Sequence, residues 1–146
     1  MLERFLKQTT FESYEDFMQN YEVRIPAHFN FAYDVIDAWA ETNPTKRAML
    51  WTNEDGEERT FSFHDLKAYS DRTASYFQSI GIGKGDVVML ILKRRYEWWV
   101  VMLALHKIGA IVIPATHMLT KHDIVYRNTR ASVKAIICVD DPYVVS

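Results

Sequence analysis

An unbroken apolar run at residues 98–105 limits what this chain can fold into more than any other feature of its sequence. The run reads Trp-Trp-Val-Val-Met-Leu-Ala-Leu and lies in a stretch, residues 95–108, that predicts a helix ended by Gly109. Because consecutive helical positions are about 100° apart, the run points in every direction, whereas a surface helix keeps one polar face. We therefore predict a helix that other protein covers on both sides.

The energy of burying this helix implies a larger surrounding structure. Each large apolar side chain stabilises a fold by roughly 2 kcal/mol when it is buried. Leaving half of the eight large apolar residues between positions 96 and 108 in water would forgo about 8 kcal/mol, and a whole domain has a net stability of only ~5 to 15 kcal/mol. Since we expect the strands and helices predicted below to cover one side only, we also expect further protein around this helix.

The second half of the chain alternates strands with helices. Beside the helix at residues 95–108, the pattern predicts apolar strands at residues 87–92, 111–114 and 134–139, and a helix that Thr120 caps and that runs to about Arg130. Strands that are apolar throughout and are joined by helices form a parallel sheet with both faces covered. The fold class is therefore α/β, with a βαβαβ unit in this half.

The first half predicts helices and a β-hairpin. Residues 1–22 contain a leading amphipathic helix over residues 10–21, whose apolar face we expect to pack; its apolar positions are Phe11, Tyr14, Phe17, Met18 and Tyr21. A second helix begins with Asn30 as its cap and ends at Asn43-Pro44. Strands at residues 48–52 and 59–63 flank the tight turn at residues 53–56, which is the pattern of a hairpin. Ser62 and Asp65 then resemble a capping box that opens a long helix to Ile80.

Charge and composition exclude several classes of protein. A net charge of -2 and a pI near 6.2 leave no basic surface of the kind that a nucleic-acid backbone requires, so we expect no nucleic-acid partner. No apolar stretch approaches the roughly 20 residues of a membrane span, and Glu3, Arg4 and Lys7 interrupt the apolar segment that a secretion signal needs. The single cysteine, Cys138, lies in an apolar strand and predicts a buried thiol. We expect a cytoplasmic protein.

The polar motifs favour structural roles over chemistry. The glycines of residues 81–85 precede a strand, whereas a phosphate-binding loop precedes a helix, so they are interpreted as a helix stop and a turn. His117 and His122 are five positions apart rather than four, and no other residue completes a ligand set, so we predict no metal site. The basic run at residues 93–95 is interpreted as a solvated loop, with a phosphate-bearing ligand as the alternative.

Five segments, in order along the chain, resemble the medium-chain acyl-CoA synthetases of the adenylate-forming superfamily. They are residues 29–40 (FNFAYDVIDAWA), 84–88 (KGDVV), 97–99 (EWW), 107–116 (KIGAIVIPAT) and 123–127 (DIVYR). The resemblance covers about residues 23 to 141, and it is specific because several motifs recur together. It implies that residues 23–146 are an incomplete part of the large N-terminal domain of such an enzyme.

The resemblance also implies a reaction. In this family a carboxylate attacks the α-phosphate of ATP to give an acyl-adenylate and pyrophosphate, and the thiol of coenzyme A then displaces AMP. ATP, Mg²⁺ and coenzyme A would serve the complete enzyme, with a fatty or related carboxylic acid as substrate and the remainder of the synthetase as partner. The family's catalytic motifs are expected beyond Ser146, so we assign no catalytic residue here and expect this chain to be inactive alone, without tight binding of those ligands.

Two residues are candidates for contact with coenzyme A. Residues 114–117 match the place where related synthetases pass near the coenzyme A entrance, so the resemblance implies that Thr116 and His117 contact coenzyme A. Ala115 departs from the family, which often has glycine there. Two other classes of protein remain open: a free-standing α/β module that binds a nucleotide or coenzyme A, and a structural protein that buries its apolar helix against a partner.

Overall fold

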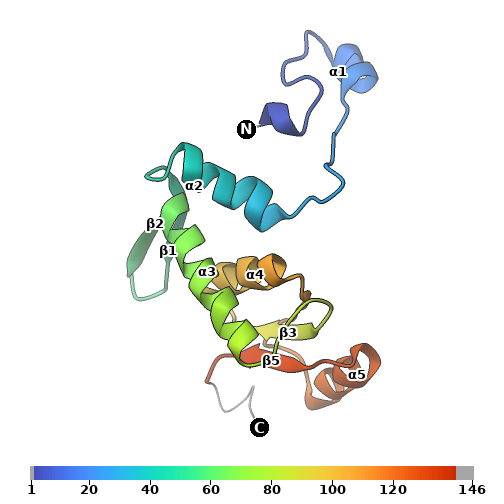
Figure 1. Cartoon of the computed structure of the whole chain (residues 1–146). Helices are drawn as coiled ribbons and strands as arrows, with labels where there is room; N and C mark the ends of the chain where they lie inside the picture. The colour runs from blue at the N-terminus through green and yellow to red at the C-terminus, as the bar shows by residue number, and fades with distance from the viewer. Residues whose placement is uncertain (1, 141–146) are drawn as a thin grey trace.

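The computed structural model describes residues 2–140 (Figure 1). Its elements, in chain order, are η1 (Leu2–Arg4), α1 (Tyr14–Asn20), η2 (Ala32–Asp37), α2 (Ala38–Thr42), β1 (Arg47–Thr52), β2 (Glu58–Ser62), α3 (Phe63–Ser79), β3 (Val87–Ile91), α4 (Glu97–Ile108), β4 (Ile111–Pro114), α5 (Lys121–Ala131) and β5 (Ala135–Cys138). Strands β1 and β2 form an antiparallel hairpin, and β3, β4 and β5 form a parallel sheet. The predicted α/β class, hairpin and βαβαβ unit are therefore confirmed.

Strand β3 is the centre of the parallel sheet, whose order is β4-β3-β5. Val88 pairs with Val112 on one side and with Ala135 on the other. The connection from β3 to β4 and the connection from β4 to β5 run across the sheet in opposite directions, so right-handed crossovers place α4 and α5 on opposite faces (Figure 1). Four consecutive residues of β3, Val88–Ile91, are at most 1% exposed, which explains why this strand is apolar throughout.

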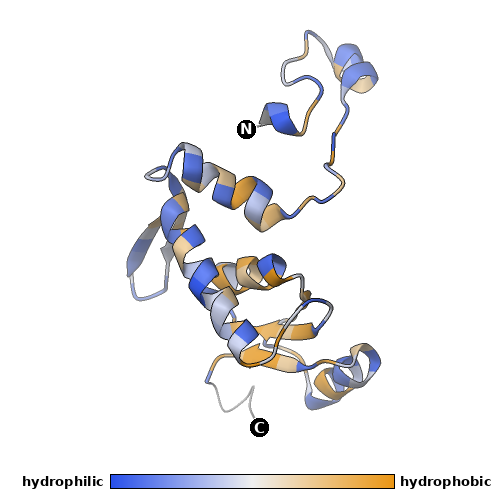
Figure 2. Ribbon diagram, in the orientation of Figure 1, coloured by the Kyte–Doolittle hydropathy of each residue, from blue (hydrophilic) through white to orange (hydrophobic). Residues whose placement is uncertain are grey.

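Helix α4 packs one face against the sheet. Val101, Ala104 and Leu105 belong to a buried group, here called the sheet cluster, that includes Val88 and Leu90 of β3 and Ala74 and Phe77 of α3. Figure 2 shows the strands of the sheet and much of α4 in the colours of hydrophobic residues. Gly109 ends the helix in the left-handed conformation, with a φ of 72°, as the sequence predicts.

The opposite face of α4 is also covered, by elements from the first half of the chain. Leu103 lies in a second buried group, the hairpin cluster, with Ala32, Ile36, Phe61 and Leu66. The prediction that this chain can cover only one side of the helix is therefore wrong, because η2, the hairpin and α3 together supply the second side. Only Trp99 of the apolar run remains exposed, at 53%.

A buried ion network joins three helices. The ammonium of Lys107, on α4, lies 2.9 Å from a carboxylate oxygen of Asp37 and 2.5 Å from one of Asp71, on α3. Lys67 approaches the same two acids, at 3.6 Å and 2.7 Å. The side chain of Lys107 is 1% exposed and that of Asp37 is 8% exposed, so each charged group is stabilised by the other rather than by water.

The leading helix does not pack as predicted. It spans only Tyr14–Asn20, and none of its residues is buried. Its aromatic residues contact one another instead: the ring of Phe17 lies 5.2 Å from that of Phe11 and 4.8 Å from that of Tyr21. Figure 1 shows α1 standing apart from the sheet and from α3 and α4. The division of the chain at residue 22 stays a prediction.

The second helix is confirmed in position but not in regularity. It begins as the π-helix η2 and continues as α2. As predicted, Asn30 caps it, because the Asn30 side-chain oxygen accepts a hydrogen bond of 3.0 Å from the backbone N–H of Ala32. The side-chain amide of Asn30 also donates to the carbonyl of His106 at 2.8 Å, which ties this helix start to α4.

The predicted capping box of α3 is confirmed. The Ser62 hydroxyl accepts a bond from the backbone N–H of Asp65, and the Asp65 carboxylate accepts bonds from both the hydroxyl and the backbone N–H of Ser62. The hydrogen bond from the Ser62 hydroxyl, followed by that from the Ser62 backbone N–H, holds the pKa of Asp65 below its usual value.

Replacing Ser62 with alanine should therefore lower the free energy of unfolding by about 1 kcal/mol. The substitution removes the side-chain acceptor for an N–H at the start of a helix of 17 residues. Urea unfolding followed by circular dichroism measures the change. Ser75→Ala, on the exposed side of the same helix, is the matched control and should change stability by less than about 0.5 kcal/mol. Equal losses in the two variants would contradict a capping role.

Candidate functional site

The carboxyl ends of β3 and β4 lie side by side at one edge of the sheet. Leu90 pairs with Pro114, and the N–H of Ala115 donates to the carbonyl of Leu90 at 2.9 Å. The loop after β3 leads to α4 on one face, whereas the loop after β4 leads to α5 on the other. In open parallel sheets, ligands bind outside the carboxyl ends of strands where the connections diverge in this way. This edge is therefore the candidate site.

Thr116 and His117 lie in the loop after β4, at this edge. Both residues are exposed. The Thr116 hydroxyl oxygen accepts a bond of 3.3 Å from the N–H of Met118, and the carbonyl of Thr116 accepts one of 3.4 Å from Leu119. The hydroxyl keeps its own hydrogen as a donor. The geometry thus presents a hydroxyl and an imidazole to solvent beside β3.

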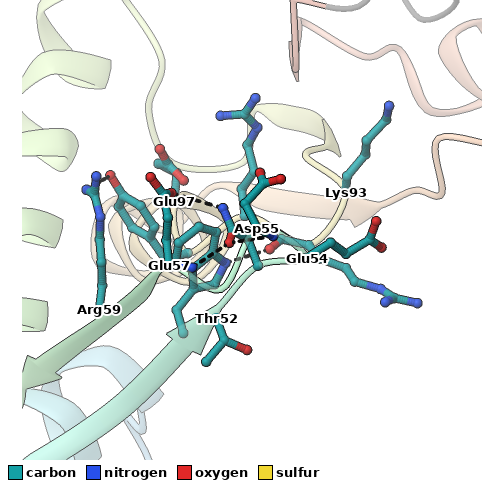
Figure 3. Close-up of a pocket in the computed structure, with 12 residues that line it drawn as sticks. Thr52, Glu54, Asp55, Glu57, Arg59, Lys93 and Glu97 are labelled. Atoms are coloured by element: carbon teal, nitrogen blue, oxygen red, sulfur yellow. Dashed lines mark hydrogen bonds between the residues drawn. The ribbon is translucent and has the colours of Figure 1, made fainter.

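A groove of about 620 Å³ borders the loop after β3. Its two walls are the turn of the β1–β2 hairpin and residues 93–97. Figure 3 shows Glu54, Asp55 and Glu57 of the turn near Arg59, Lys93 and Glu97. The full lining contains four acidic and four basic residues, so opposite charges balance across it: Glu54, Asp55, Glu57 and Glu97 with Arg59, Lys93, Arg94 and Arg95. This balance does not single out an anionic ligand.

Two contacts fix the hairpin against this loop. The indole N–H of Trp51 donates to the carbonyl of Arg94 at 2.7 Å, and the guanidinium of Arg59 donates to the Tyr96 hydroxyl at 2.9 Å. The same guanidinium lies 5.1 Å from the centre of the Tyr96 ring. Burial, together with the charge of Glu97, raises the pKa of the Tyr96 hydroxyl. Sequence reasoning missed these contacts, since their partners are 43 and 37 positions apart.

The basic run at residues 93–95 is exposed throughout, as the interpretation of a solvated loop predicts. Lys93 has a φ of 51°, in the left-handed region that few residues other than glycine adopt. Together with the bond from Trp51 to the neighbouring carbonyl, this conformation turns the chain from β3 into α4. The run therefore forms a turn whose path is set by its backbone.

The glycine-rich segment at residues 81–85 is a turn, as predicted. Gly81 and Gly85 have φ values of 84° and 83°. The loop's N–H groups bond within the protein: that of Gly83 donates to the Asp86 carboxylate at 2.7 Å, and that of Gly85 to the carbonyl of Gly109 at 2.9 Å. The bond from Lys134, followed by that from Gly83, lowers the pKa of Asp86. The Asp86 carboxylate thus accepts the bond from the Gly83 N–H, a donor that a phosphate bound in this loop would need.

The histidines lie on different elements. His117 is in the loop after β4 and His122 is on α5, both exposed. His106 is on α4, and burial lowers the pKa of its imidazole. Within residues 2–140, no three His, Cys, Asp or Glu side chains lie close enough to hold a metal ion together. Over the same residues, no helix is both long and apolar enough to cross a bilayer.

Comparison with known families decides the affiliation of this chain. The family described as AMP-binding enzyme matches residues 36–145, which include the hairpin, the sheet and both of its crossover helices. The chain belongs to this family. The matched residues include the candidate site at the sheet edge, but the match does not assign a role to Thr116 or His117.

Several relatives of this chain are acyl-coenzyme A synthetases, which are ligases. It is 37% identical over 136 residues to the human mitochondrial synthetase ACSM3, a match that covers 89% of this chain and 23% of the relative. It is 36% identical over 122 residues to the rat mitochondrial synthetase ACSM5, covering 80% and 21%. The resemblance drawn from the sequence motifs is confirmed. The chain spans less than a quarter of the length of these relatives.

Solved structures show the same architecture. The N-terminal subdomain of NpsA from Klebsiella oxytoca is 25% identical with a TM-score of 0.66, and the match covers 73% of this chain and 27% of that one. The fatty acid AMP ligase from Legionella pneumophila is 22% identical with a TM-score of 0.67, covering 75% and 20%. The second likeness shows the fold alone. The first likeness places most of this chain within an N-terminal subdomain of an adenylate-forming enzyme.

Proposed function

We propose that this chain is the first part of an AMP-forming acyl-CoA synthetase, whose complete form joins a carboxylic acid to coenzyme A through an acyl-adenylate. The observation that carries the proposal is the family match over residues 36–145, combined with 37% identity to an acyl-coenzyme A synthetase over 136 residues. A fatty or related acid is the proposed substrate, and ATP and Mg²⁺ are the proposed cosubstrate and metal.

Within this reaction, the residues of the sheet edge are proposed to contact coenzyme A. Thr116 and His117 are exposed at the carboxyl end of β4, and each carries a hydrogen-bonding group suited to the amides or phosphates of coenzyme A. Coenzyme A supplies the thiol that accepts the acyl group. These two side chains would hold and orient it, and neither is assigned a proton transfer.

The described residues offer ATP and Mg²⁺ no comparable set of contacts. The N–H groups of Gly83 and Gly85 already have partners, and residues 2–140 assemble no carboxylate or histidine set for Mg²⁺. No residue of this part of the chain is therefore proposed to bind ATP or Mg²⁺. The role proposed for this chain is to build the first sheet of the large domain and to supply one contact surface for coenzyme A.

An activity assay on the polypeptide translated from the complete gene tests the proposal. Incubated with ATP, Mg²⁺ and octanoate, it should release pyrophosphate as the acyl-adenylate forms, and it should form acyl-CoA and release pyrophosphate continuously only when coenzyme A is also present. The 146-residue chain by itself should release none. Release of pyrophosphate by the isolated chain would refute the inactivity, and no acid-dependent release by the complete polypeptide, with any carboxylic acid tried, would refute the function.

Alanine at Thr116 or His117 in the complete enzyme should raise the KM for coenzyme A about 3- to 10-fold, as expected for the loss of one hydrogen bond. The acid-dependent exchange of pyrophosphate into ATP, which needs no coenzyme A, should be unchanged. The matched control is His122→Ala, an exposed histidine on α5. An equal effect in the control, or a loss of the exchange reaction, would contradict a specific contact with coenzyme A.

Two points of the sequence interpretation remain predictions with direct tests. A free-standing binding module is the second candidate function, and calorimetric titration of the 146-residue chain with ATP and with coenzyme A tests it, because saturable tight binding would favour the module.

The cytoplasm is the predicted location, whereas the relatives above carry mitochondrial names. Imaging of the complete protein with a fluorescent protein at its C-terminus decides between the two compartments.

A further inference from the structure

An apolar groove of about 500 Å³ lies between η2, the hairpin and the first turns of α4. Every residue that lines it is apolar, and the lining includes Phe31, Val35, Trp39, Leu50, Trp99 and Leu103. Three of them are well exposed: Trp99 at 53%, Leu50 at 49% and Phe31 at 45%. Exposed apolar surface that is gathered in one hollow marks an interaction site.

The apolar groove is the open side of a core. Leu103 in its lining is buried in the hairpin cluster, and Val35 packs against that cluster. The same cluster covers the second face of α4, so the groove continues a buried region out to the surface. An occupant would therefore extend an existing core rather than create a separate contact.

We propose that the apolar groove is the docking surface for apolar side chains from a later segment of the same polypeptide. The proposal rests on the proposed function, and it names the surface where the remainder of the synthetase meets this part. The relatives are more than four times as long as the matched stretch, which covers 23% of ACSM3. Because the lining carries no charge, it offers no partner for a phosphate, a nucleotide or a charged peptide.

Two other occupants fit the groove less well. The chain's own leading segment has acidic residues among its aromatic ones, Glu12, Glu15 and Asp16, which a wholly apolar groove would desolvate without compensation. A second copy placed by two-fold symmetry would bring the same patch against itself. Two hollows that face each other leave a void and bury little surface.

Hydroxyl-radical footprinting with mass spectrometry tests the proposal. The 146-residue chain and the polypeptide from the complete gene are oxidised under the same dose, and modification of Trp99 and Leu50 is compared with that of Tyr76. Tyr76 is 59% exposed near the far end of α3 and serves as the internal control. We expect modification of Trp99 and Leu50 to fall at least 5-fold in the complete polypeptide, and that of Tyr76 to change less than 2-fold.

Other results would overturn the proposal. Unchanged modification of Trp99 would leave the groove open in the complete polypeptide, and equal protection of Tyr76 would remove the assignment to the groove. Protection that rises with concentration in the 146-residue chain would identify a second copy as the occupant. A reading frame that closes at Ser146 would leave no later segment to dock.

Substitution gives a second measurement that does not depend on oxidation chemistry. Trp99→Glu should lower the melting temperature of the complete polypeptide by more than twice the change that it causes in the 146-residue chain, whereas Tyr76→Glu should cause similar changes in both. Acyl-CoA synthesis is measured on the same complete sample. If Trp99 is protected but no acyl-CoA is formed, the proposed function is refuted and the docking surface is supported. If acyl-CoA is formed but Trp99 is not protected, the docking surface is refuted and the proposed function is supported.

Discussion

Replacing Lys107 with methionine should lower the free energy of unfolding by about 3 to 5 kcal/mol. Methionine keeps the length and the apolar stem of the side chain but removes the ammonium that lies 2.9 Å from Asp37 and 2.5 Å from Asp71. The Asp37 carboxylate, at 8% exposure, would then lose its nearest cation, and only the more distant Lys67 would remain beside it. Urea unfolding of the chain at neutral pH measures the loss.

The matched control for this variant is Lys67→Met. Lys67 binds the same two acids, but its side chain is 36% exposed, so water compensates for its removal and the expected loss is below about 1 kcal/mol. A double variant, Lys107→Met with Asp37→Leu, should recover much of the loss because no buried charge is left unpaired. A loss of less than 1 kcal/mol in Lys107→Met alone would show that the network does not carry this stability.

The same network predicts the sign of the pH dependence. Burial alone would raise the pKa of Asp71, but the hydrogen bonds from Lys107 and Lys67 hold that pKa below its usual value of 3.8. A carboxylate whose pKa is lowered by folding contributes stability above about pH 4, and this stability is lost as the pH falls through its native pKa. Acidification from pH 6 to pH 3 should therefore destabilise the native protein more than the Lys107→Met variant. Urea midpoints at the two pH values measure the difference.

Replacing Leu105 with alanine should lower the free energy of unfolding by about 3 to 5 kcal/mol. Leu105 is fully buried in the sheet cluster, between β3 and α3, so alanine would leave a cavity in addition to removing apolar contacts. Leu50→Ala is the same substitution at a residue that is 49% exposed, and it should cost less than about 1 kcal/mol. Urea unfolding compares the two variants.

This comparison also tests how completely the chain encloses its apolar helix. If the sheet, α3 and the hairpin bury α4 as the structure shows, the loss in Leu105→Ala should appear in the 146-residue chain without further protein. Equal, small losses at Leu105 and Leu50 would mean that the helix is not packed in this chain.

Much of the architecture could be predicted because its signals are local. The capping boxes at Ser62–Asp65 and Thr120–Asp123 join residues three positions apart, and the stop at Gly109 depends on the conformational freedom of one residue. The alternation of apolar strands with helices predicted the parallel sheet and both crossovers, which the structure confirms. The family also followed from motifs in the sequence, and the match over residues 36–145 confirms it.

The failures share a physical cause. The helix at residues 10–21 was predicted to pack because its apolar residues recur at helical spacing, but spacing does not provide a surface for them to pack against. The cover on the second face of α4 comes from residues 32–66, which the pattern of α4 itself cannot reveal. At the candidate site, the roles of Thr116 and His117 stay predictions, since the structure gives their positions and exposure only.

The amino-acid sequence by itself determined which segments are helices or strands, where several of them begin and end, and to which family the chain belongs, because each of these depends on neighbours within one or two helical turns or on ordered motifs. Only the tertiary structure decided that Lys107 meets Asp37 and Asp71, that Trp51 holds the loop after β3, and that one apolar groove stays open. The contacts of Lys107 and Trp51 join residues 36 to 70 positions apart, and they form only because the helices and strands bring these residues together in space.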